Sequence, residues 1–68
     1  MKVKSLDSGL ALVELTVQDI STINNALNEV CNGIHLEGEF DTRMGCSVEE
    51  ARDLLDEIHR LAESFDSN

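Results

Sequence analysis

Proline, tryptophan and tyrosine are missing from this chain of 68 residues, and Phe40 and Phe65 are its two phenylalanines. Without proline the chain holds no polyproline spacer, and with so few aromatic rings its core must consist of Leu, Ile, Val, Ala and Met. No apolar run approaches the ~20 residues that a membrane-spanning helix needs. Basic residues are scarce too, since five Lys and Arg stand against fourteen Asp and Glu, a net charge of −9. That charge repels phosphate backbones and anionic lipids, so we expect neither nucleic acid nor a membrane as a direct partner.

The remaining composition is typical of a small folded domain. Hydrophobic residues make up 41% of the chain, too many for a disordered acidic tail. A chain of this length forms one domain, residues 1–68, and leaves no room for a deep, enclosed active site. Lys2 and Lys4 are not followed by the apolar stretch of a signal peptide, so we expect a cytoplasmic protein whose cysteines are reduced.

The first fifteen residues predict a β-hairpin over residues 2–15. Asp7-Ser8-Gly9 is a turn signal, because glycine adopts a positive φ at no steric cost. The strand that follows, residues 9–15, alternates Leu10 and Leu12 on one side with apolar residues on the other. A strand that is apolar on both sides suggests a central position or a covered outer face.

Two amphipathic helices are predicted, over residues 17–32 and 48–64. Thr16 is a suitable N-cap for the first helix, and Asn32-Gly33 a suitable end. Ser47 followed by Glu50 is the capping box of the second. Apolar residues recur at three- and four-residue steps in both helices, which is typical of one buried face; in the second they are Val48, Ala51, Leu54, Leu55, Ile58, Leu61, Ala62 and Phe65.

Between the helices, residues 34–46 are predicted to form a loop and a short strand. The strand is placed at residues 39–44, where Phe40, Thr42 and Met44 alternate with polar residues. The expected order is therefore β-β-α-β-α. The expected fold is a two-layer α+β domain, in which a small antiparallel sheet packs against two helices.

Most of this pattern resembles a group of small standalone bacterial proteins. The resemblance lies in NNALNEVCNG at residues 24–33, EFDTRMG at 39–45, and the Ser-x-Glu-Glu-Ala helix start at 47–51. It implies a bacterial, cytoplasmic protein of one domain, and it assigns no catalytic or binding role to any residue.

Residues that can carry chemistry are present but poorly spaced. Cys31, His35, Cys46 and His59 are potential zinc ligands, yet only the first two lie close together, whereas structural zinc sites usually have two tight pairs. A thiol beside a helix start is a typical nucleophile, but His59 lies about 20 Å along the helix from Cys46, too far to act as its base. We therefore expect no metal, no cofactor and no enzymatic activity, with a thiol or metal-dependent enzyme as a minor alternative.

Three groups of polar residues remain as candidates for binding a partner. Acidic residues, among them Asp53, Asp56 and Glu57, lie opposite the apolar face of residues 48–64, either as a solvated surface or as a landing site for a basic protein. Asn24 and Asn28 belong to an asparagine-rich quadrant of the first helix. Their amides either bind the backbone of the following loop or form a neutral interface.

Arg43 is the third candidate, because it is surrounded by acidic residues. We expect it to pair locally with Asp41, Glu39 or a helix carboxylate, or else to anchor an interface.

From the sequence we hypothesise a small acidic domain that binds a more basic protein through the second helix and the segment around Arg43. By analogy of size and charge, inhibitors, immunity proteins and antitoxins are built in this way. The alternative is a homodimer with a structural or regulatory role, whose charge serves solubility. The two-sided apolar strand at residues 9–15 distinguishes them, because a second protomer is its natural cover if the chain does not cover it.

Overall fold

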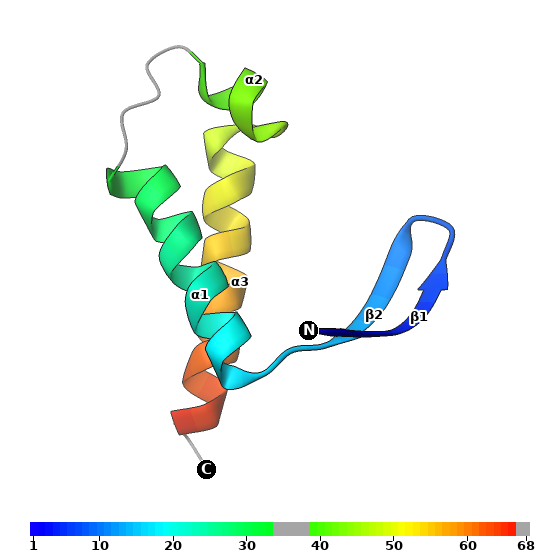
Figure 1. The fold of residues 1–68 in the computed structure, drawn as a ribbon. Coiled ribbons are helices and arrows are strands. Elements are labelled where there is room, and N and C mark those ends of the chain that lie inside the picture. Colours follow the sequence, from blue (N-terminus) through cyan, green and yellow to red (C-terminus); the bar gives the residue numbers. More distant parts are fainter. Residues whose placement is uncertain (34–38, 67–68) are drawn as a thin grey trace.

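The computed structural model describes residues 1–33 and 39–66, which form a β-hairpin followed by helices (Figure 1). The elements are β1 (Lys2–Asp7), β2 (Leu10–Glu14), α1 (Val17–Asn28), a π-helical turn η1 (Glu29–Gly33), α2 (Phe40–Met44) and α3 (Val48–Asp66). The hairpin and the two long helices are confirmed, and the class is α+β. No helix within residues 1–33 and 39–66 is long and apolar enough to cross a membrane.

The hairpin closes through the turn that its sequence predicts. Gly9 has a φ of 83°, in the left-handed region that glycine tolerates, and the backbone N–H of Ser8 donates to Asp7 Oδ1 at 2.7 Å. The strands pair antiparallel, with Val3 opposite Val13 and Leu6 opposite Ala11. The register shifts between Val3 and Ser5, so Lys4 is an additional residue in β1.

Both long helices begin at capping boxes. Thr16 Oγ1 accepts from the backbone N–H of Asp19 at 3.0 Å, and Asp19 Oδ2 accepts from the backbone N–H of Thr16 at 3.1 Å. At α3, Ser47 Oγ accepts from the Glu50 N–H and Glu50 Oε1 from the Ser47 N–H, each at 3.1 Å. The first helix keeps α-helical geometry only to Asn28 and continues as η1 to Gly33.

The strand predicted at residues 39–44 is wrong, because Phe40–Met44 form helix α2. Phe40 and Met44 are four residues apart, so a pattern that alternates on a strand also places them on one side of a helix. Both are half-buried. A helical turn also satisfies its backbone locally, and α2 ends at Gly45, whose φ is 75° and whose N–H donates to Asp41 O at 2.9 Å.

The core lies between α1 and α3, which pack side by side in opposite directions (Figure 1). Ile20 on α1 and Ala51 on α3 are each 2% exposed, and they are the buried hydrophobic residues of the described chain. Around them lies a half-buried layer: Ile23, Leu27, Val30, Cys31, Val48, Leu55, Ile58 and Ala62. The predicted apolar face of the first helix therefore meets a part of the apolar face predicted for the second.

The hairpin stands away from this helical pair, so the predicted packing of a sheet against two helices is wrong (Figure 1). Every strand residue is exposed except Val13, which is half-buried. The radius of gyration is 13.6 Å, against ~11 Å for a compact domain of this length. Within residues 1–33 and 39–66 the sheet β1–β2 is left uncovered on both faces, and this determines the surfaces available for binding.

Candidate protein-interaction surfaces

The residues predicted to bind a partner lie on three separate helices. Arg43 is exposed on α2, where its Nη1 lies 3.7 Å from Glu39 Oε2, so the predicted local pairing is confirmed. Asp53, Asp56 and Glu57 are exposed on α3, and within residues 1–33 and 39–66 none of them has an ion-pair partner. The structure therefore leaves these three acidic side chains available.

The asparagines of α1 behave differently from one another. Asn28 is exposed, and its Oδ1 accepts from Asn32 Nδ2 at 3.0 Å. Asn24 is half-buried, and its Oδ1 is buried without a hydrogen-bond partner in the described part of the chain. The predicted loop contacts fall partly on residues 34–38, outside the described residues. Among the described residues, no hydrogen bond or ion pair joins α1 asparagines, Arg43 and the α3 acids into one site.

Within the described residues, the two thiols and His59 form no recognisable chemical centre. Cys31 lies in η1 and Cys46 just before the cap of α3, and both are free and half-buried. His59 Nε2 lies 2.9 Å from Glu63 Oε1, one turn further along α3. The described segments contain no group of three His, Cys, Asp or Glu side chains that could hold a metal ion, and His35 falls outside them.

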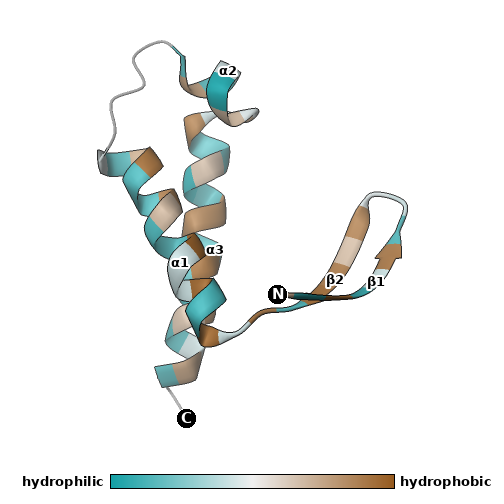
Figure 2. Cartoon of the chain, in the orientation of Figure 1, coloured by the Kyte–Doolittle hydropathy of each residue, from teal (hydrophilic) through white to brown (hydrophobic). Residues whose placement is uncertain are grey.

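Exposed apolar side chains are a more prominent feature than any of these polar groups. Brown, hydrophobic segments run along both strands of the isolated hairpin (Figure 2). The register assigns them to two faces. The face that we name the apolar hairpin face consists of Val3, Leu6, Ala11 and Val13, without a polar side chain. Leu6 on this face is 76% exposed.

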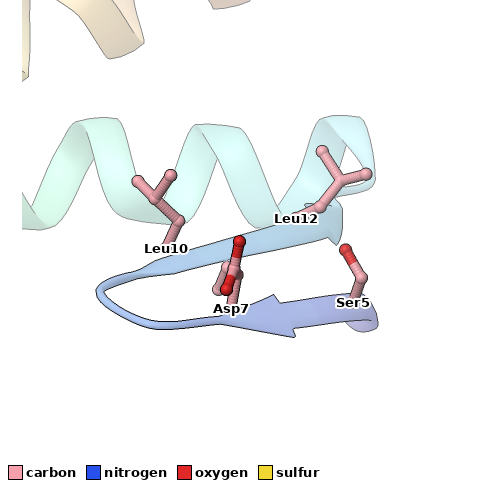
Figure 3. Close-up of a pocket in the computed structure, with 5 residues that line it drawn as sticks. Ser5, Asp7, Leu10 and Leu12 are labelled. Atoms are coloured by element: carbon pink, nitrogen blue, oxygen red, sulfur yellow. The ribbon is translucent and has the colours of Figure 1, made fainter.

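The opposite face of the hairpin is mixed. Leu10 and Leu12 lie there beside Ser5 and Asp7, and with Ala11 they line an open hollow of about 320 Å³ (Figure 3). The sequence signalled both faces through the two-sided apolar pattern of residues 9–15. The pattern did not show that the chain leaves them bare.

A second apolar surface, the α3 stripe, lies on the flank of α3. It consists of Leu54, Leu61 and Phe65, which are 48%, 41% and 44% exposed. Glu50 and Glu57 precede and follow Leu54 by about one turn, so they border the stripe. Sequence periodicity assigned the stripe to the buried arc of this helix, but one neighbouring helix is too narrow to cover the whole arc.

Charge is distributed unevenly between the hairpin and the helices. Residues 1–15 contain two lysines and two acids, so their side chains have no formal net charge, and the −9 of the chain lies on residues 16–68. The N-terminal amino group of Met1 lies 2.9 Å from Asp19 Oδ2, and this contact, with the Thr16 N–H, holds the pKa of Asp19 below its usual value. The Ser47 N–H and hydroxyl likewise lower the pKa of Glu50.

The accessible surface measures how much of the chain is left uncovered. It is 5421 Å², whereas a compact monomer of 7.5 kDa exposes about 4,200 Å². The excess of roughly 1,200 Å² exceeds the ~800 Å² that each partner buries in an interface of standard size.

No protein-family model, curated protein or solved structure matches this chain.

Proposed function

We propose that this chain is a protein-interaction module without catalytic activity, which works as a homodimer with its hairpin in the interface. The observation that carries the proposal is the bare hairpin, whose large side chains Leu6, Leu10 and Leu12 are 76%, 75% and 65% exposed. Two-stranded hairpins are at best marginally stable in water by themselves. The chain supplies no cover for this one in its described part, so a second molecule has to.

Core size supports the same proposal. Among the described residues the fully buried core is one isoleucine and one alanine, which is small for a domain, and domains of this size are marginal in general. Burying the excess surface of about 1,200 Å² per chain in an interface would remove apolar area from water on both copies.

Charge selects the hairpin as the place where two copies meet. A contact between two helical parts, residues 16–68, would set −9 against −9, whereas a hairpin without net side-chain charge can approach either a second hairpin or a helical part without that repulsion. Added salt screens the remaining repulsion between the copies. We therefore expect the dimer to become tighter, and not weaker, as ionic strength rises.

Sedimentation equilibrium of Leu6→Ser and Leu10→Ser, one variant for each hairpin face, tests the proposal. Full burial of a leucine side chain stabilises by ~1.5–3 kcal/mol, and about three-quarters of the Leu6 side chain is exposed and can be buried in an interface. Replacing Leu6 in both copies should therefore weaken the free energy of association by roughly 2–5 kcal/mol. The dissociation constant should rise by roughly 30- to 3,000-fold for at least one variant. Asn25→Ser, on the exposed side of α1, is the control. Wild type that sediments as a monomer, or two variants that associate as wild type does, would refute the proposal.

A second candidate function is docking of a more basic protein on the outer side of α3. It is favoured by the exposed acids Asp53, Asp56 and Glu57, which have no cationic partner in the described part of the chain. Complementary charges at such a surface act mainly on the rate of encounter. The two functions are compatible, because one uses the hairpin and the other the outer side of a helix.

A further inference from the structure

We infer that the apolar hairpin face of each copy docks on the α3 stripe of the other copy. This inference rests on the proposed homodimer and states which surfaces meet in it. The two-layer arrangement of a sheet against helices would then form between copies and not within one chain. The contact is reciprocal, so it occurs twice about a two-fold axis.

The two surfaces are matched in character. The apolar hairpin face, Val3, Leu6, Ala11 and Val13, has no polar side chain. The α3 stripe presents two leucines and a phenylalanine that are each between 41% and 48% exposed. Both are the uncovered apolar parts of otherwise polar elements, and each is a few side chains wide. Together they contain much of the exposed apolar surface that a standard interface would bury.

Charge determines which hairpin face is used. Glu50 and Glu57 border the α3 stripe, and the mixed face of the hairpin contains the charged side chains of Lys2, Asp7 and Glu14. Placing the mixed face on the stripe would take charged side chains out of water and set the carboxylates of Asp7 and Glu14 beside the acidic border, whereas the apolar face keeps them on the far side. Lys4 already has a partner on the hairpin, because its Nζ lies 2.8 Å from Glu14 Oε1.

Contacts at the base of the hairpin hold it away from the two long helices of its own chain. The link between β2 and α1 is Leu15 and Thr16, and Thr16 is committed to the capping box of α1. The start of β1 is tied to the same helix end, because the Met1 amino group lies 2.9 Å from Asp19 Oδ2. A hairpin fixed at its base to the start of α1 is presented to another molecule, and the stripe of its own α3 stays open.

Cross-linking between chains tests this arrangement. Single-cysteine chains are made in a Cys31→Ala/Cys46→Ala background whose helicity and sedimentation are checked first. A Leu6→Cys chain is mixed with a tagged Leu61→Cys chain and treated with a short bismaleimide. We expect the 6–61 heterodimer to be the dominant product. Leu10→Cys mixed with Leu61→Cys is the matched control, because Leu10 is as exposed as Leu6 but lies on the mixed face, and its yield should be several-fold lower.

Each other outcome overturns the inference in a recognisable way. A dimer by sedimentation that yields 6–6 and no 6–61 product would mean that hairpins meet each other, and the proposed homodimer would stand. A chain with both Leu6→Cys and Leu61→Cys that links only within itself would show closure onto its own helices. A Leu10 yield equal to that of Leu6 would overturn the choice of face. A monomeric wild type would overturn this inference and the proposed function together.

Discussion

Truncation of Ile20 is the most direct test of the helical core. Ile20 is 2% exposed, and with Ala51 it forms the buried centre between α1 and α3. Ile20→Ala removes most of that side chain. Because the buried centre between α1 and α3 is small, few other buried contacts remain to offset the loss. Ile20→Val removes one methylene and provides a graded companion variant.

The expected magnitude is large relative to the stability of the whole chain. A buried Ile→Ala change costs ~2–5 kcal/mol, and Ile→Val costs ~0.5–1.5 kcal/mol. At roughly 0.05–0.15 kcal/mol per residue, a chain of 68 residues has a total free energy of unfolding of about 3–10 kcal/mol. Ile20→Ala should therefore leave a measurable unfolded fraction without denaturant, whereas Ile20→Val should stay folded with a lower midpoint.

Urea unfolding followed by far-UV circular dichroism measures both variants. Chain concentration has to be equal in all samples, because association of folded chains adds to the apparent stability. Val17→Ala is the control, since Val17 is on the same helix but 57% exposed, and its effect should stay within about ±0.5 kcal/mol. An Ile20→Ala variant as stable as this control would refute the assignment of the core to the α1–α3 contact.

Two further predictions concern α3. The pKa of Glu50 is lowered by the capping box, so the box stabilises the fold above the ordinary value of 4.5 and that stability is lost as pH falls through the lowered pKa. The thermal midpoint of Glu50→Gln should be lower than that of wild type near pH 7, and the difference between the two midpoints should close below about pH 4. Glu49→Gln is the control. A difference in midpoint that does not change with pH would contradict this prediction. Asp53→Lys/Asp56→Lys should slow association with a basic partner at low salt and much less at high salt, with stability within about ±0.5 kcal/mol. Equal association rates at low salt would make the acidic side a solubility surface.

The sequence predicted those parts of the fold that short-range interactions decide. Thr16 with Asp19, and Ser47 with Glu50, close capping boxes within three residues, so the starts of both long helices were readable. Gly9 permits the positive φ of the hairpin turn by itself. Of the candidate residues, the exposure of Asp53, Asp56 and Glu57 followed from helical periodicity, and the local pairing of Arg43 followed from the acidic residues around it in the sequence.

Tertiary structure alone decided that Phe40–Met44 form a helix and not a strand, and it alone decided where the sheet lies. Phe40 and Met44 fit one face of a helix as well as one face of a strand, and a strand needs a partner whose presence no local pattern reveals. Both faces of β2 are apolar and require cover, and this need could be predicted because it depends only on the side chains of the strand. Whether that cover comes from the same chain depends on the direction in which Leu15 and Thr16 lead from the sheet into α1. The contact between the Met1 amino group and Asp19 ties the start of β1 to the start of that helix. This contact joins residues far apart in the chain, so periodicity cannot encode it.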